Sequence, residues 1–242
     1  MAALAAFCGI VLAAALVQGI SGFAFNMIVL MVFPHLFGYT SSLALGGLLA
    51  VVANFYSVAL YRKHINWTWV FRWLAVYLVA DLLAVFVLKK VGDHPIWYTL
   101  MGVIFVLMAI YLLWGQKLIR VQASVTTLLV TAILSGLIMG MFGVGGPLLA
   151  AFFLVATHGN KEYLGTSQLA GGCAMGIDFL IRMGNGMFPM ALAGYALLGF
   201  VVMIAGALLA KRLVSHMDPL VLRKFICLVI FCDGIFMLFH NV

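Results

Sequence analysis

Eight long apolar stretches make up nearly the whole of this chain and limit its fold more than any other feature. The stretches are 2–37, 42–61, 67–88, 96–115, 124–157, 163–183, 189–210 and 219–239. A bilayer's hydrocarbon core is crossed by roughly 20 helical residues. Because 67% of the residues are hydrophobic and only 8% are charged, there are too few polar residues to coat a water-soluble globule. We therefore predict an all-α polytopic membrane protein.

The first and fifth stretches are unusual because each is about 35 residues long and carries a glycine-rich break near its middle. The breaks are 18–26 (QGISGFAFN) and 140–147 (GMFGVGGP). A shift of 121 residues, half the chain, superposes Gly22 on Gly143 and also superposes the pattern of stretches. This self-similarity predicts two repeats, 1–121 and 122–242, each with four hydrophobic segments, which form one transmembrane domain.

The distribution of Lys and Arg indicates how the stretches cross the membrane. If all eight cross once, the basic residues divide six to seven and orient nothing. If the first and fifth stretches fold into hairpins at their breaks, ten basic residues lie on one side, and only Lys89, Lys90 and Arg182 lie opposite. An excess of ten basic residues on one side over three on the other satisfies the positive-inside rule. We therefore predict inverted repeats, with the ten-charge side in the cytoplasm and both termini outside.

The two breaks are candidate substrate sites. Backbone that leaves a helix at membrane depth is tolerated where it is packed in protein or lines a cavity. A helix that restarts there presents unpaired N–H groups and the positive end of its dipole, which suit a small anion. The predicted substrate-binding residues in the breaks are Gln18, Ser21, Gly22, Asn26, Gly143, Gly145, Gly146 and Pro147. The alternative is that these small residues only let helices pack closely.

Stretches 42–61 and 163–183 each carry a small or polar helical face. The first face comprises Gly46, Ala50, Asn54, Ser57 and Tyr61, and the 121-residue shift carries it onto Ser167, Gly171, Met175, Asp178 and Arg182. We expect these faces to line the central site, with Asn54, Ser167 and Gln168 as substrate-binding residues. Helix packing is again the alternative explanation.

Ionisable residues inside apolar stretches are costly and are therefore candidates for coupling or gating. They are Asp81, Asp178, Arg182 and Asp233. Asp178 and Arg182 are four residues apart and can pair, and Arg182 is expected near water at the end of its stretch. Asp81 and Asp233 have no such local partner, so either could carry a coupling proton or bond a neighbouring helix.

Other functions have little support in the sequence. The net charge of +7 comes from scattered basic residues, which fits membrane orientation better than nucleic-acid binding. P-loop, dinucleotide and Gly-x-Ser-x-Gly motifs are absent, and His and Cys residues lack metal-ligand spacing. We expect no enzymatic activity, no metal and no cofactor. The expected partners are a small anion, membrane lipid and a second copy of the chain in a homodimer.

The motifs Gly19-x-x-Gly22-Phe and Gly140-x-x-Gly143-Val-Gly-Gly-Pro, followed by Leu164-Gly165-Thr166-Ser167, resemble the TauE/SafE family of sulfite and organosulfonate exporters. The resemblance covers essentially the whole chain, although Phe25 and Asn26 stand where glycines are common. It implies export of a small sulfur-containing anion, such as sulfite, thiosulfate, sulfoacetate or a related sulfonate. The implied location is the bacterial inner membrane.

Together these observations predict a secondary transporter that works by alternating access. The helix N-termini of the two breaks would hold the anion near the bilayer midplane. Because the chain has no ATP-binding signature, the driving force would be a gradient. A membrane-embedded scaffold or assembly subunit and a passive anion channel are the alternatives.

Overall fold

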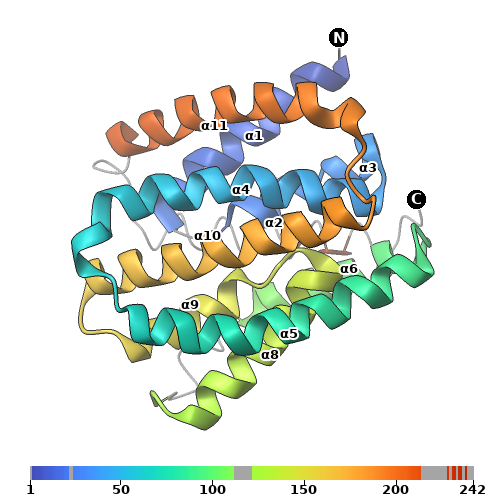
Figure 1. Ribbon diagram of the computed structural model, residues 1–242. Coiled ribbons are helices and arrows are strands. Elements are labelled where there is room, and N and C mark those ends of the chain that lie inside the picture. Colours follow the sequence, from blue (N-terminus) through green and yellow to red (C-terminus); the bar gives the residue numbers. More distant parts are fainter. Residues whose placement is uncertain are drawn as a thin grey trace.

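The computed structural model describes residues 2–21, 24–111 and 122–213, with six further positions between 228 and 238. Within these residues every regular element is a helix (Figure 1). The first half contains α1 (Ala2–Ser21), α2 (Phe25–Val29), α3 (Phe33–Phe37), α4 (Tyr39–Tyr61), η1 (Arg62–His64), α5 (Trp67–Val91) and α6 (Ile96–Ile110). The second half contains α8 (Val125–Phe142), α9 (Gly146–Ala156), α10 (Asn160–Gly184), η3 (Met190–Leu192) and α11 (Ala193–Leu213).

Four helical segments in the described part are long and apolar enough to cross a membrane. They are Tyr39–His64, Trp67–Val91, Val125–Phe142 and Met190–Ala210. Shorter apolar helices accompany them, so the prediction of an all-α chain with several membrane crossings is confirmed. The last predicted stretch, 219–239, falls mostly outside the described residues.

The helix boundaries repeat at the predicted offset of 121 residues. The paired boundaries are Ser21 with Phe142, Phe25 with Gly146, and Tyr39 with Asn160. The residue before each long central helix has the same unusual backbone, with φ 79° and ψ 165° at Gly38 and φ 98° and ψ 165° at Gly159. Only glycine adopts this conformation readily. That 1–121 and 122–242 are inverted copies stays a prediction.

The chain folds back on itself at both breaks. In the first half, the ring of Phe7, near the start of α1, stacks on Phe33 of α3 at 5.3 Å between centroids. In the second half, Ser135 Oγ of α8 donates a hydrogen bond of 2.7 Å to the carbonyl of Gly145, just beyond the helix end. Each long stretch is therefore a hairpin and not one straight spanning helix.

The connecting loops gather at two ends of the bundle. At one end Asn66 Nδ2 donates to Glu162 Oε1 at 3.1 Å, and at the other Lys89 Nζ donates to Asn185 Oδ1 at 2.9 Å. Hairpins at the two breaks predict this grouping, whereas eight single crossings would put Asn66 and Glu162 at opposite ends. Which end faces the cytoplasm stays a prediction.

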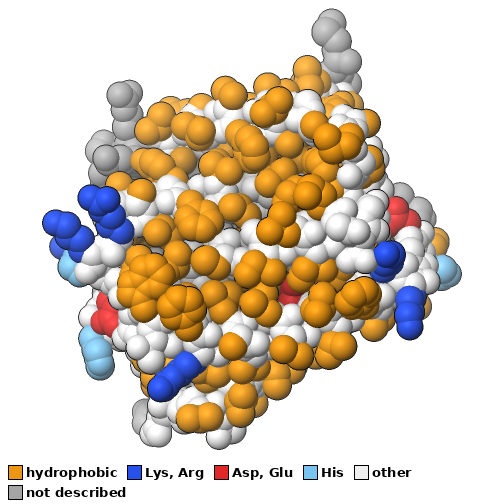
Figure 2. Space-filling view, in the orientation of Figure 1, with side chains coloured by type: hydrophobic (Ala, Val, Ile, Leu, Met, Phe, Trp, Pro, Cys, Tyr) orange, Lys and Arg blue, Asp and Glu red, His pale blue; other side chains and the backbone are white. Residues whose placement is uncertain are grey.

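The central helices α4 and α10 lie side by side, α5 packs on α8 and α10, and α1 packs on α11 (Figure 1). Hydrophobic side chains cover most of the outer face, and Lys and Arg lie toward its two ends (Figure 2). Large apolar side chains such as Phe71 and Leu197 are about two-thirds exposed. A surface of this kind is stable in contact with lipid and not with water. The site therefore has to lie inside the bundle.

Candidate functional site

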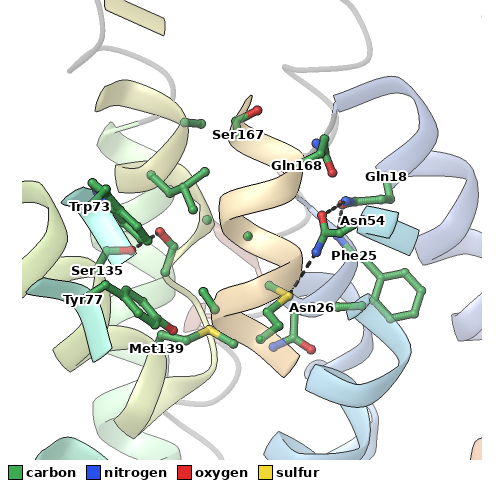
Figure 3. A pocket seen from close by; sticks show the side chains of 18 of the residues that line it. Gln18, Phe25, Asn26, Asn54, Trp73, Tyr77, Ser135, Met139, Ser167 and Gln168 are labelled. Atoms are coloured by element: carbon green, nitrogen blue, oxygen red, sulfur yellow. Dashed lines mark hydrogen bonds between the residues drawn. The ribbon is translucent and has the colours of Figure 1, made fainter. Parts of the chain in front are cut away.

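An internal cavity lies where the two breaks approach each other between α4, α5 and α10 (Figure 3). Its open volume is about 30 Å³, which is room for about two water molecules. Seven of the predicted substrate-binding residues line it, namely Gln18, Asn26, Asn54, Gly145, Gly146, Ser167 and Gln168. Gly143 and Pro147 lie beside it in the second break. Gly22 and the side chain of Ser21 fall outside the described part of the chain.

The second break turns the start of a helix toward this cavity. Gly143 ends α8 in the left-handed region, at φ 71°, and Gly145 and Gly146 line the cavity where α9 begins. A Cβ at Gly145 would lie 2.8 Å from the carbonyl oxygen of Ser135, so only glycine fits. First-turn N–H groups have no acceptor within their own helix. The positive end of the α9 dipole therefore faces the cavity.

The first break contributes side-chain amides as well as a short helix. Helix α2 has only five residues, and the Phe25 N–H donates to Gln18 Oε1 at 3.0 Å. Gln18 Nε2 in turn donates to Asn54 Oδ1 at 3.4 Å. The Gln18 amide therefore engages the first N–H of α2. That the helix N-termini of both breaks hold the anion stays a prediction.

Asn26 joins the two breaks directly. Its Nδ2 donates to the carbonyl of Gly143 at 2.5 Å, although 117 residues separate them in sequence. Gly143 lies at φ 71°, in the left-handed region, so a side chain at this junction would strain the backbone. The two breaks meet inside the bundle, and at least one donor of the Asn26 amide is used in joining them.

Helix α5 supplies cavity residues that the sequence analysis missed, Trp73 and Tyr77. The Trp73 side chain is fully buried, and its Nε1 has no hydrogen-bond partner in the described structure. The ring stacks on Tyr77 at 4.8 Å and tilts against Phe153 at 5.9 Å, which fixes its position. The available signal was spacing, because Trp73, Tyr77 and Asp81 recur every four residues on one helical face.

Asp178 and Arg182 form the predicted ion pair, with Arg182 Nε 2.8 Å from Asp178 Oδ2. The expected position of Arg182 near water is wrong, because the residue is 0% exposed. Its Nη2 donates to the carbonyls of Met139 at 3.2 Å and Gly140 at 2.7 Å. The last carbonyls of a helix lack partners within it. The break that ends α8 thus provides the acceptors that draw the guanidinium inward.

Asp81 is also buried, at 0% exposed, beside this ion pair. The expectation that it has no local partner is corrected by Tyr77, one helical turn earlier, whose hydroxyl lies 3.5 Å from Asp81 Oδ1. The other carboxyl oxygen, Oδ2, has no hydrogen-bond partner in the described part of the protein. Asp233, the fourth ionisable candidate, falls outside the described residues.

A wider hollow of about 720 Å³ opens at the end of the bundle where α10 begins. Its charged and titratable lining residues are Lys63, His64, His158, Lys161 and Glu162. The Asn66 amide and the His158 N–H bond to the Glu162 carboxylate and hold its pKa below the usual range. Tyr163, the next residue of α10, lines the internal cavity. This hollow, the basic vestibule, therefore lies close to the cavity along α10.

Comparison with known proteins identifies the group to which this architecture corresponds. The family model described as Sulfite exporter TauE/SafE matches residues 7–237. No curated protein and no solved structure matches the chain. The resemblance read from the glycine motifs is confirmed. Proteins of this family are membrane transporters and not enzymes, so both of these predictions are confirmed as well.

Proposed function

We propose, on the premise that the chain belongs to the sulfite exporter TauE/SafE family, that it exports a small sulfur-containing anion across the bacterial inner membrane. Candidate substrates are sulfite, thiosulfate, sulfoacetate and related sulfonates. One observation carries the placement of the site: the N-terminus of α9 and the unpartnered Nε1 of buried Trp73 face the same cavity. Both are hydrogen-bond donors, so their common ligand should be an acceptor, as an oxyanion is.

The cavity suits binding that must be reversed in every cycle. Backbone N–H groups at the start of α9, the Trp73 indole and the Asn54 amide are all uncharged donors, and no Lys or Arg is among the described residues that line the cavity. Hydrogen bonds from several neutral donors hold an anion without an opposing full charge. Release therefore does not require breaking an ion pair in a medium of low dielectric constant.

The basic vestibule provides an approach to the cavity from one end. Lys63 and Lys161 outnumber Glu162 there, and a cleft lined by one sign of charge concentrates the opposite ion. In the proposed cycle, the hairpins of the two inverted halves move so that the cavity opens alternately to this vestibule and to the opposite end. The narrow cavity of the present structure corresponds to a closed state of that cycle.

Flux through purified protein in liposomes tests the proposal. Liposomes loaded with unlabelled thiosulfate should take up radiolabelled thiosulfate from outside by exchange, with saturation, and sulfite or sulfoacetate should compete. Absence of flux for sulfite, thiosulfate, sulfoacetate and taurine would favour the scaffold alternative. A flux that does not saturate with thiosulfate concentration, and that internal anion does not accelerate, would favour the passive anion channel.

A further inference from the structure

Asp81 is a buried carboxyl group that the proposed binding site does not use. It lies in α5, and each helix packed against it there presents a different surface. Helix α8 presents glycine: a Cβ at Gly140 would lie 3.2 Å from Asp81 Oδ1. Helix α10 presents Asp178 and Arg182, and α5 itself presents Tyr77. These three are the titratable groups that face Asp81 in the described structure.

The charges of this cluster balance only if Asp81 is neutral. Arg182 Nε contacts both carboxylate oxygens of Asp178, at 2.9 and 2.8 Å, so that pair has no net charge. An ionised Asp81 would add a second carboxylate beside Asp178, with Oδ2 left without a hydrogen bond. Two carboxyl groups that share a buried site do not both ionise readily. A proton on Asp81 would remove this conflict, because the cluster would then carry no net charge.

Two residues contact both the anion cavity and the cluster of Asp81, Asp178 and Arg182. Tyr77 lines the cavity and also lies within hydrogen-bond reach of Asp81. Met139 lines the cavity too, and its carbonyl accepts from Arg182. Over so short a path inside protein, where the dielectric constant is low, charge in the cavity strongly influences charge on Asp81.

We propose that Asp81 is the coupling site of the transporter, and that its proton travels with the anion. This inference rests on the proposed function. A bound anion disfavours a negative charge on Asp81, and by reciprocity a protonated Asp81 favours anion binding. Asp81 takes one proton from water on the side where the anion binds, and releases it where the anion leaves. Each transported anion therefore moves together with one proton.

Proton movement during transport tests this inference. Liposomes containing the protein and a trapped pH-sensitive dye receive external thiosulfate, which does not titrate between about pH 6 and 9. The wild-type protein should acidify the lumen as thiosulfate enters. D81N, which mimics the protonated side chain, should still exchange thiosulfate but lose the acidification. The matched control is Asp93→Asn. Asp93 lies in the loop after α5, where its carboxylate accepts from the Thr40 N–H, and this variant should still acidify the lumen.

Binding measurements give a second readout. The wild-type affinity for thiosulfate should fall as pH rises, by at most about tenfold per pH unit for one linked proton, whereas D81N should show no such fall. If D81N does not fold, Asp81→Glu should retain the acidification and Tyr77→Phe should weaken it. Wild-type thiosulfate flux without acidification, or with alkalinisation, overturns this inference alone. Absence of flux for every candidate anion instead overturns the proposed function.

Discussion

Asn54 and Met175 occupy matching positions of the two halves, 121 residues apart, and they touch, with Asn54 Nδ2 3.3 Å from Met175 Sδ (Figure 3). A thioether sulfur is a weak acceptor. The Asn54 oxygen is engaged by Gln18, which orients the amide so that its N–H group points across the cavity wall. This N–H group can exchange a poor acceptor for an anionic oxygen without leaving another strong acceptor unpaired.

Asn54→Leu should therefore weaken thiosulfate binding. Hydrogen bonds to charged groups contribute about 1.5–3 kcal/mol, so the dissociation constant measured by calorimetry in detergent should rise by roughly 10- to 100-fold. Met175→Leu, which removes only the weak acceptor, is the control and should bind at least as well as wild type. Equal losses in both variants would mean that the contact matters for packing and not for the ligand.

Trp73→Phe should raise the thiosulfate concentration needed for half-maximal exchange by about tenfold, because it removes one indole donor and keeps an aromatic ring in the stack. Trp67 lies on the same helix but is 54% exposed. The control variant Trp67→Phe should therefore leave exchange unchanged. Equal exchange kinetics in the Trp73 variant and wild type would remove α5 from the proposed binding site.

The sequence predicts the helix boundaries and hairpins around the site better than the side-chain contacts within it. The ends of α1 and α8 follow from the glycines of the breaks, and the start of α9 follows from Pro147. The hairpins follow from the distribution of charge. The role of Asn26 does not follow, because nothing local shows that the Gly143 carbonyl of the other half will take its amide. Contacts between halves depend on how hairpins dock, which periodicity does not encode.

The same limit explains why Trp73 was missed and why Arg182 was expected near water. Trp73 lies in a continuous apolar stretch where every face could meet lipid, so only the packing of α5 on α8 and α10 selects its face as a cavity wall. Arg182 lies near the end of α10, where water is the usual environment. Its burial depends on carbonyls of α8 that are some 40 residues away in sequence.

Gly145→Ala should destabilise the protein, because its Cβ would lie 2.8 Å from both the carbonyl oxygen and Oγ of Ser135. Overpacking of this kind typically costs about 1–3 kcal/mol, which a thermal unfolding curve in detergent should reveal as a lower midpoint. Gly9→Ala in α1 is the control, since a Cβ there meets nothing within 4 Å and helix propensity improves. An unchanged midpoint at position 145 would show that the break relaxes without cost.

Single cysteines in a cysteine-free background test the topology. Cysteines placed at Lys63 and Lys161, which line the basic vestibule, should both be protected from an impermeant thiol reagent added to intact cells. Cysteines at Lys89 and Asn185, which contact each other at the other end, should both label. Labelling that separates Lys63 from Lys161 would contradict the hairpin arrangement, and full reversal would contradict only the predicted orientation.

Arg182→Gln should act on folding before it acts on the anion. The guanidinium satisfies two carbonyls at the end of α8 and balances the carboxylate of Asp178. Removing one partner of a buried pair typically costs about 3–5 kcal/mol, so the unfolding midpoint should fall sharply. Adding Asp178→Asn removes the unpaired charge and should restore part of the lost stability, which a binding role for Arg182 does not predict.

The thiosulfate affinity of the folded double variant should fall less than that of Asn54→Leu. A single Arg182→Gln variant with a normal midpoint and no binding would instead place the anion at the guanidinium.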